Sequence, residues 1–375
     1  MVYLGKGGDM LVNSDTIYKL INVIDEQLAG LFEERMHICR KIGEYKKERA
    51  LPVKDAARES AINAKSSSLI KDAEIEAYYI DFQKNNIKLS CALQEKVING
   101  MKVAYSGVEG AYAYIAAKRM FPGAQLISYA NFEPAYRAVE AGEADCAVLP
   151  LENSYAGDVG NVMDLAFSGS LFVNRVGELE IEHNLIVVPG TQLSDIRTVV
   201  SHPQALAQCD EYIKEHGFET REYSNTARAA AYVMEAKDPS VAAIASSDTA
   251  EIFGLEILEH KINTSANNTS RFAVFSRVQN RPPENDKNEK HSFIMVFTVP
   301  DEAGALAMTL DIIGAHGFNM KNLKSRPMKG LMWKYYFYVE GTGNINTQNG
   351  KDMLNELSVI CSDLKLVGSY GSDII

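Results

Sequence analysis

The sequence lacks the features that mark export, membrane insertion or metal binding. It has five cysteines, and none stands in CxxC spacing: Cys39, Cys91, Cys146, Cys209 and Cys361. Neither a zinc knuckle nor a disulfide framework is therefore indicated. No stretch approaches the ~18 uninterrupted apolar residues of a membrane span, and residues 1–15 have no apolar signal-peptide core. These absences predict a cytoplasmic protein with no metal site and no membrane partner.

The chain also lacks a basic surface of the kind that binds nucleic acid. Its formal net charge is −11 and it has no polybasic run, so binding to a phosphate backbone or to an anionic membrane is not expected. What is present is an ordinary globular composition, with 46% apolar residues in a length of 375. Two or three folded domains are predicted.

Helical periodicity fills residues 1–100. An apolar seam without proline runs from Ser14 to Arg49, and Leu51-Pro52 then breaks it. A second helix is predicted to begin near Asp55, and a third to cover roughly Glu74 to Ile98. Because no strand pattern interrupts this stretch, it is predicted to be an all-α domain.

Alternating strands and helices fill residues 101–278. Apolar runs such as KVAYSG, CAVLPLEN and VAAIASS are separated by helical stretches, which predicts a parallel α/β architecture in two successive lobes. A polar, proline-bearing linker follows at 279–290. In residues 291–375 the order is strand, helix, strand, strand, helix, strand, which predicts an α+β domain of ferredoxin-like arrangement.

One charged residue interrupts the seam of the first helix. Apolar residues recur in steps of three and four from Ile21 to Tyr45, and Arg35 occupies one of these core positions. An unpaired buried charge costs several kcal/mol, so an anion must meet the guanidinium there. The sequence leaves open whether this anion is an internal carboxylate or a bound ligand.

Further polar side chains are expected near Arg35. Helical spacing points Ser90 and Gln94 the same way and brings Lys46 near the side of Arg35. The start of the second helix adds three charged residues: Asp55, Arg58 and Glu59. Gathered in one bundle, these groups would form a pocket rich in cations and hydrogen-bond donors, which suits a small dicarboxylate.

This first segment resembles the helical chorismate mutases in the runs DEQLAGLFEERMHICRKIGEYK and PVKDAARES. That family rearranges chorismate to prephenate in a pericyclic reaction, with no nucleophile and no cofactor. The resemblance implies that Lys46 donates to the ether oxygen of the breaking bond and that Glu59 is also catalytic. It implies five substrate-binding residues: Arg35, Asp55, Arg58, Ser90 and Gln94. Preorganised donors aimed at developing negative charge are commonly the largest catalytic term.

One position departs from the mutase family. The family has an arginine seven residues before the aspartate that aligns with Asp25, where this chain has Tyr18. In dimeric members that arginine reaches the site of the partner subunit. Lys19 is adjacent but points about 100° away around the helix. Two interpretations stay open: a working mutase, or a catalytically decayed helical domain that serves dimerisation.

Polar clusters follow several strands of the central segment, where open α/β sheets place their ligand sites. They occur at residues 106–107, 152–154 and 201–204, with Gln208 one turn further on. Gly107 and Gly110 lack GxGxxG spacing, so a turn is favoured over a phosphate loop. His202 has no partner at metal-ligand spacing, which favours a hydrogen-bonding residue at a helix start.

The central segment resembles prephenate dehydratase in YSGVEGAY, PLENSYAG, SHPQALAQC and NNTSRFAVFSR. The family has threonine before the Arg-Phe pair, and this chain has Ser270, with Thr269 as the alternative hydroxyl. The resemblance implies that Ser270 protonates the departing hydroxyl of prephenate and that Arg271 holds a substrate carboxylate. It places four more residues in the cleft: Glu152, Asn153, Ser201 and Gln208. Helix capping is the structural alternative for Ser201 and Gln208.

The implied dehydratase chemistry needs no cofactor. Loss of CO₂ and hydroxide from prephenate creates an aromatic ring, so protonation of the leaving group and orientation suffice. A non-catalytic solute-binding protein stays open as a third interpretation, because two α/β lobes around a cleft are also periplasmic-binding-like. Under the enzymatic interpretation, Arg35 and Arg271 are expected to face anion-binding cavities rather than internal acids.

The last segment resembles the ACT domains that follow such dehydratases, in DEAGALAMTLDIIGAHGFNMKNLKSRP. In that family phenylalanine binds between two such domains and inhibits the enzyme. The implied effector residues are Gly304, Ala305, Leu306, Ala307, Asn319, Ser325, Arg326 and Pro327. Small residues at a helix start allow backbone amides to approach a carboxylate, although a tight turn is the alternative. Lys324 departs from the family, which has glutamate there.

The resemblances together predict a fused enzyme of phenylalanine biosynthesis. Its substrates would be chorismate and prephenate, and its effector phenylalanine. They also imply a homodimer or a homotetramer. The alternative is a prephenate dehydratase whose helical domain no longer catalyses.

Overall fold

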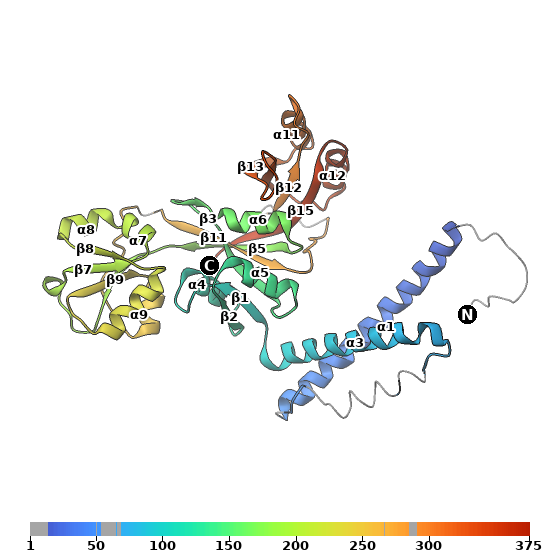
Figure 1. The fold of residues 1–375 in the computed structure, drawn as a ribbon, viewed down its shortest axis with the longest axis horizontal. Helices are drawn as coiled ribbons and strands as arrows, with labels where there is room; N and C mark the ends of the chain where they lie inside the picture. Colours follow the sequence, from blue (N-terminus) through green and yellow to red (C-terminus); the bar gives the residue numbers. More distant parts are fainter. Residues whose placement is uncertain (1–13, 50, 54–64, 66–68, 266, 285–290) are drawn as a thin grey trace, which may run out of the picture. The chain divides into compact units, whose positions relative to one another are not determined.

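The chain forms two compact units, residues 1–101 and 102–375, which are described separately. The computed structural model describes residues 14–49, 51–53, 65, 69–265, 267–284 and 291–375 (Figure 1). Within these described ranges, no helix combines the length and the apolar character needed to cross a membrane.

The first unit is built from two long helices. They are α1 (Ser14–Glu48) and α3 (Ala73–Asn99), which confirms the helical prediction for this segment. The N-cap of α3 is Asp72, whose carboxylate accepts from the Glu74 amide at 2.9 Å. Gly43 permits close packing, because a Cβ there would lie 3.1 Å from the Val97 Cβ. The second helix predicted near Asp55 lies outside the described residues.

The second unit contains two lobes, each around its own sheet. The first-lobe elements are β1 (Lys102–Ser106), α4 (Tyr112–Met120), β2 (Gln125–Tyr129), α5 (Phe132–Glu140), β3 (Cys146–Asn153), β4 (Gly157–Asp158), α6 (Gly160–Ser168), β5 (Phe172–Glu180) and β11 (Thr269–Ser276). The second-lobe elements are β6 (Asn184–Val187), η2 (Leu193–Asp195), β7 (Thr198–Ser201), α7 (Pro203–Gln208), α8 (Asp210–His216), β8 (Glu219–Glu222), α9 (Thr226–Ala236), β9 (Val241–Ala245), α10 (Ser247–Phe253) and β10 (Glu256–Glu259).

The predicted α/β class is confirmed, but the prediction of parallel sheets in successive lobes is wrong. Strand β11 follows the second lobe in sequence, yet it returns to pair antiparallel with β3 and β5 of the first lobe. In the second lobe, β6 is antiparallel to β9 and β10, whereas β7 is parallel to β8 and β9. Alternation of strands and helices cannot tell which sheet a strand joins, because pairing partners lie far apart in sequence.

The C-terminal part follows the predicted order of elements. They are β12 (His291–Thr298), α11 (Ala305–Ala315), β13 (Asn319–Pro327), β14 (Tyr335–Thr342), α12 (Gln348–Ile360) and β15 (Ser362–Ile374). The four strands lie in the order β13-β14-β12-β15 and pair antiparallel. Strand β15 continues beyond β12 to pair parallel with β5, so one sheet joins the C-terminal part to the first lobe.

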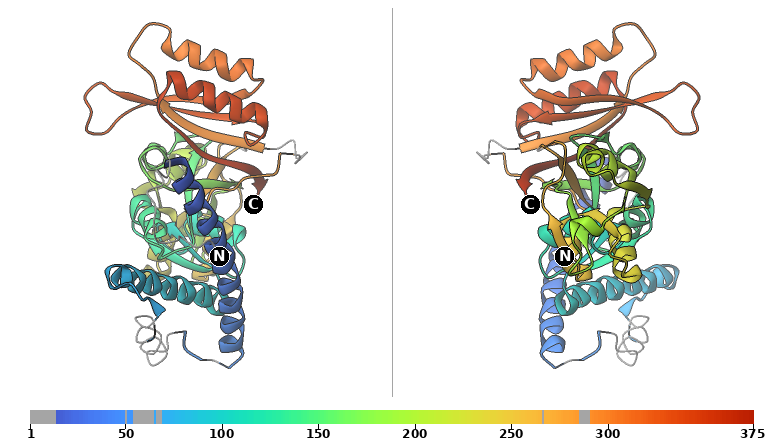
Figure 2. Two further views of the ribbon diagram at one scale, coloured as in Figure 1. Left: turned by 90° about the vertical axis from the view of Figure 1, so that its right-hand side faces the viewer. Right: turned by 90° about the vertical axis from the view of Figure 1, so that its left-hand side faces the viewer.

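This C-terminal sheet is covered on both faces. Helices α11 and α12 lie on the side away from the first lobe (Figure 2), over a core that includes Phe293 and Phe297. On the opposite face, Ile294 and Val296 join a single apolar cluster with first-lobe residues such as Leu149. Burial on both faces accounts for the continuous apolar run of β12. The first lobe and the C-terminal part therefore share one core.

Candidate active sites

The buried stripe of α3 is polar. Asn86, Ser90 and Gln94 recur every four residues and are the buried residues of that helix. Arg35 of α1 donates to the Asn86 carbonyl at 3.2 Å and to the Ser90 hydroxyl. The Gln94 Oε1 atom is buried without a partner among the described residues. No described carboxylate pairs with Arg35. In contrast to the predicted core position, Arg35 is only partly buried and Leu31 and Ile38 beside it are exposed, so within the described residues its charge is open to solvent.

The rest of the predicted mutase site is only partly described. The Lys46 ammonium donates to the Val53 carbonyl at 2.5 Å, just beyond the end of α1. Asp55, Arg58 and Glu59 lie outside the described residues. Tyr18, at the position of the family's arginine, is 67% exposed. The structure thus joins Arg35 to Ser90 but shows no contact between either residue and Lys46.

A cavity of about 320 Å³ is lined by residues of both lobes in the second unit. Four predicted cleft residues line it: Glu152, Asn153, Gln208 and Ser270. Ser201 does not, because it is fully buried and its hydroxyl donates to the Ile244 carbonyl at 2.6 Å. His202 lines the cavity as the N-cap of α7, accepting from the Gln204 amide at 3.2 Å. The prediction of His202 as a hydrogen-bonding helix start is confirmed.

The register of β3 and β11 brings Ser270 to the cavity. Ser270 pairs across the strands with Asn153, and the Asn153 Nδ2 donates to the Ser270 hydroxyl oxygen at 2.9 Å. The amide orientation is fixed, because the Asn153 Oδ1 accepts from the backbone amides of Tyr155 and Ala156. An amide nitrogen only donates, so the proton of Ser270 is left free for another acceptor. Thr269, the alternative hydroxyl, is not among the residues that line the cavity.

A chain of hydrogen bonds continues from Asn153 into the second lobe. The Asn153 Nδ2 donates to the Asn268 Oδ1 at 2.8 Å, and the Asn268 Nδ2 donates to the Gln208 Oε1 at 3.0 Å. That oxygen lies 2.7 Å from the His183 Nε2, which must therefore carry the ring proton. The other ring nitrogen faces the Tyr112 hydroxyl at 3.1 Å. Two backbone amides thus determine the tautomer of a distant histidine.

Burial favours the neutral forms of the titratable side chains in this hydrogen-bond series, His183 and Tyr112. Burial lowers the pKa of His183, and the hydrogen bond with Gln208 opposes this only in part. Burial likewise raises the pKa of the Tyr112 hydroxyl. Burial therefore favours the neutral forms of both His183 and Tyr112 at the cavity wall.

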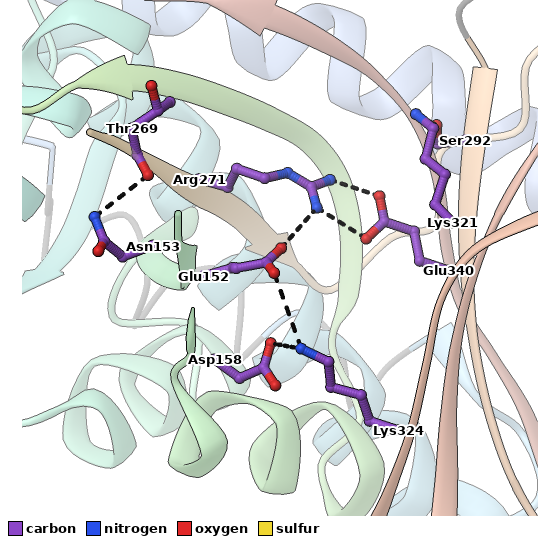
Figure 3. A network of polar contacts seen from close by, with 9 residues as sticks. All are labelled: Glu152, Asn153, Asp158, Thr269, Arg271, Ser292, Lys321, Lys324 and Glu340. Carbon is purple, nitrogen blue, oxygen red and sulfur yellow. Dashed lines mark hydrogen bonds and ion pairs between the residues drawn. The ribbon is translucent and has the colours of Figure 1, made fainter. Parts of the chain in front are cut away.

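Arg271 does not line the cavity, in contrast to the prediction. Its guanidinium makes a two-pronged ion pair with Glu340 of β14, at 2.6 and 2.9 Å, and also donates to Glu152 at 3.3 Å (Figure 3). Burial would lower the pKa of Arg271, but the hydrogen bonds to Glu340 outweigh it and raise that pKa. Arg271 is thus tied to internal acids. A strand alternates its faces, so the residue after Ser270 points away from the cavity.

The predicted effector residues are divided between two faces of the C-terminal part. Gly304 is the N-cap of α11, in the left-handed conformation at φ 87°, and Ala305 begins the helix. Asn319, Ser325 and Pro327 are exposed. Arg326 instead points to the first lobe, where its Nε lies 2.8 Å from the Asp164 carboxylate.

No described group of three or more His, Cys, Asp or Glu side chains could hold a metal ion.

Several cavity residues escaped the sequence analysis. Among them are Tyr112, Phe132, His183, Asn225 and Thr226. His183 lies in a segment with no recognisable motif. Tyr112 lies inside the YSGVEGAY motif, and Asn225 and Thr226 come shortly after β8, so the sequence held a signal for them. Asn268 and Gln204 likewise lie inside the quoted motifs. The hydrogen-bond partners, however, come from both lobes and could not be matched in advance.

Comparison with known proteins agrees with both units. The family model for chorismate mutase type II matches residues 17–95, and that for prephenate dehydratase matches residues 103–280. The bifunctional chorismate mutase/prephenate dehydratase of Escherichia coli strain K12 is 31% identical over 94% of this chain and 95% of its own. The chain belongs to the family of bifunctional chorismate mutase/prephenate dehydratases.

Solved structures resemble the second unit. A prephenate dehydratase from Arthrobacter aurescens in complex with L-Phe is 30% identical, with a TM-score of 0.66. It covers 72% of this chain and 89% of its own. A protein described as a novel type of quorum-quenching acylase, GqqA, is 31% identical with a TM-score of 0.67, over 72% of this chain and 98% of its own.

Proposed function

We propose that this chain catalyses both reactions of its family, the rearrangement of chorismate to prephenate and the conversion of prephenate to phenylpyruvate. The observation that carries the second step is the free hydroxyl proton of Ser270 in a cavity between two lobes. Asn153 occupies an oxygen lone pair of this serine, so the serine acts as a donor. We assign Ser270 as the general acid for the departing hydroxyl.

The conversion of prephenate to phenylpyruvate requires one proton from the enzyme. As the bond between the ring and its carboxylate breaks, CO₂ leaves and the electron pair enters the ring. The ring hydroxyl departs as water with the proton of Ser270, and the serine regains a proton from solvent. The product ring is aromatic, so the step is downhill and needs mainly orientation and proton transfer. Glu152 and Gln208 line the same cavity and would orient the substrate.

One experiment tests both activities. The purified chain is incubated with chorismate, and prephenate and phenylpyruvate are followed separately over time. We expect prephenate to appear first and phenylpyruvate to follow. Phenylpyruvate from added prephenate but no prephenate from chorismate would support the decayed helical domain. Binding of prephenate without turnover would support the solute-binding interpretation.

A hydrolase of the kind named for GqqA is disfavoured by the surroundings of Ser270. A nucleophilic serine needs a base that takes its proton, as in serine hydrolases. Ser270 instead accepts a hydrogen bond from the Asn153 side-chain amide, which cannot take the serine proton. An assay with an N-acylated amide substrate distinguishes the two, and release of the acyl group would favour the acylase.

We propose that the mutase reaction takes place in a dimer joined through α1. Apolar side chains along the first half of that helix are exposed, among them Ile24 at 51% and Leu31 at 64%. An apolar stripe of this length is a typical interaction surface. Association of two copies would bury it and bring a second set of charged groups to Arg35. Sedimentation velocity tests this, and a monomer at micromolar concentration would contradict it.

We propose that the C-terminal part is a ferredoxin-like ACT domain that binds phenylalanine and lowers dehydratase activity. Its antiparallel strand order and the α11 start at Gly304 support this assignment. Trp333, the single tryptophan of the chain, is 81% exposed between β13 and β14 and is a natural reporter. Phenylalanine is expected to change its fluorescence and to inhibit dehydration. Flat curves through millimolar phenylalanine would contradict this.

A further inference from the structure

Strand β11 presents two functional faces. Ser270 and Phe272 line the cavity, whereas Arg271 between them points to the C-terminal part. Its guanidinium meets Glu340, a carboxylate of β14 that is 1% exposed. Both terminal nitrogens of Arg271 are engaged with Glu340, in the paired geometry that makes arginine–carboxylate bonds strong and directional. The strand that carries Ser270 is therefore held from behind by the C-terminal part.

The same guanidinium reaches the wall of the cavity. Arg271 pairs across the strands with Glu152, and one of its nitrogens lies 3.3 Å from the Glu152 carboxylate. Glu152 also lines the cavity. Two successive ion pairs, Glu340 to Arg271 and Arg271 to Glu152, thus run from the C-terminal part to the site (Figure 3).

A second connection runs beside the first. Lys324 of β13 forms an ion pair with Asp158 and lies 3.9 Å from Glu152. Lys321, also on β13, lies near Glu340 and acts to lower the pKa of that carboxylate. Ion pairs thus join two cations, Arg271 and Lys324, to three carboxylates, Glu152, Asp158 and Glu340, in one network (Figure 3). Glu340 is 1% exposed, so loss of its partner Arg271 would leave an uncompensated buried charge, which is costly.

We propose that Glu340 is a positioning residue of the dehydratase site. It acts through Arg271, holding the Glu152 carboxylate and the strand of Ser270 in place, so that the cavity depends on how the C-terminal part is docked. The proposal rests on the proposed dehydratase function and extends it to a residue outside the catalytic lobes. A displacement of β14 by an effector would then reach the cavity through one buried ion pair.

The direct test is Glu340→Gln in the full chain, which keeps the shape and removes the charge. We expect kcat for prephenate to fall about 10- to 100-fold, the range that a misplacement of about 1 Å can produce. We expect KM to change less, because Glu340 does not touch the cavity. The mutase rate of the same sample should stay unchanged. The control is Glu284→Gln, which removes an exposed ion pair with Lys351 in the same part of the chain.

A double-substitution cycle separates positioning from general destabilisation. Arg271→Lys keeps the charge but cannot bridge two carboxylates, so it should lower kcat as much as Glu340→Gln does. The double variant should be no slower than the slower single variant, because both break one connection. Additive losses would overturn the proposal, and so would a wild-type kcat in Glu340→Gln.

Folding and function are distinguished by two further readouts. If Glu340→Gln unfolds, as its thermal unfolding would reveal, Lys324→Met breaks the second connection at a less buried position. It should lower kcat severalfold and weaken inhibition by phenylalanine, and an unchanged kcat in both Lys324→Met and Arg271→Lys would overturn the proposal. Absence of turnover in the unmodified chain would instead contradict the proposed function itself.

Discussion

The two predicted active sites of this chain are built in opposite ways. The helical site rests on two described helices, and the apolar side chains of the first half of α1 are exposed. The dehydratase cavity instead lies between two lobes, each with its own buried core. A site backed by complete cores can function within one chain. The exposed apolar face of the helix pair is the basis of the proposal that this site is completed by a second copy.

The largest expected effect is a loss of mutase activity on substitution of Lys46. Lys46→Ala should lower the mutase rate about 10²–10³-fold if Lys46 has the role that the family resemblance implies, donation to the developing charge on the ether oxygen. The dehydratase rate should be unchanged. Both rates are measured on one preparation with chorismate and prephenate supplied separately. Lys47→Ala is the control, since Lys47 donates to the Val97 carbonyl at an exposed position. Equal losses in the two variants would contradict the role of Lys46.

Ser270→Ala should do the opposite of Lys46→Ala, lowering the dehydratase rate and leaving the mutase rate unchanged. The dehydratase rate should fall about 10²-fold or more, the usual contribution of a general acid, while the mutase rate persists. Ser276→Ala is the matched control, because Ser276 lies on the same strand and bonds Asn174 outside the cavity. A near-normal rate in Ser270→Ala together with a loss in Thr269→Val would transfer the role to Thr269.

A charge on the exposed face of α1 tests the need for a second copy. Ile24→Glu should weaken association of two chains by at least about 1.5 kcal/mol, the value of burying one such side chain. That corresponds to roughly tenfold in the dissociation constant. The mutase rate should fall at low protein concentration while the dehydratase rate holds. Asn22→Asp adds the same charge at an exposed polar position on the opposite side of α1 and should change neither. Mutase activity that persists in a monomeric Ile24→Glu variant would disprove the dimeric site.

The smallest expected effect is the pH dependence of the second unit. Burial acts to raise the pKa of Asp164 and of Glu340, but hydrogen bonds from Arg326 and Arg271 outweigh it and hold both pKa values below their ordinary 3.8 and 4.5. A carboxylate with a depressed pKa stabilises the fold above its unfolded pKa and loses this contribution as pH falls through the folded pKa. Stability should therefore hold from pH 7 to about 5 and decline in more acidic solution.

Urea unfolding at several pH values, followed by far-UV circular dichroism, measures this decline. Asp164→Asn should flatten part of it, because it removes one of the two titrating carboxylates. An unaltered dependence in that variant would assign the acid sensitivity to other groups.

Local features were predictable from the sequence. The helices of the first unit follow from apolar spacing, and the α11 start at Gly304 follows from a run of small residues. Ser90 and Gln94 share a buried face because both stand at helical spacing on one element. Ser270 and Asn153 both line the cavity, as the motifs indicated. The assignment of phenylalanine as effector stays a prediction.

Features that depend on distant partners could not be predicted. The motif that holds Arg271 was identified, but its partner Glu340 lies 69 residues further along the chain. Ser201 belongs to a motif that follows a strand, yet the second lobe buries it against β9. The two lobes are not successive, because β11 crosses back into the first sheet.

The sequence by itself determined which segments are helical or α/β, which family they match, and that Asn153, Gln208 and Ser270 lie in motifs that reach one cavity. These properties are local, since periodicity and short motifs involve neighbours along the chain. Only the tertiary structure decided that one face of β11 serves the cavity while the other meets Glu340. That choice depends on strand register and on the docking of the C-terminal part, which bring together groups remote in sequence.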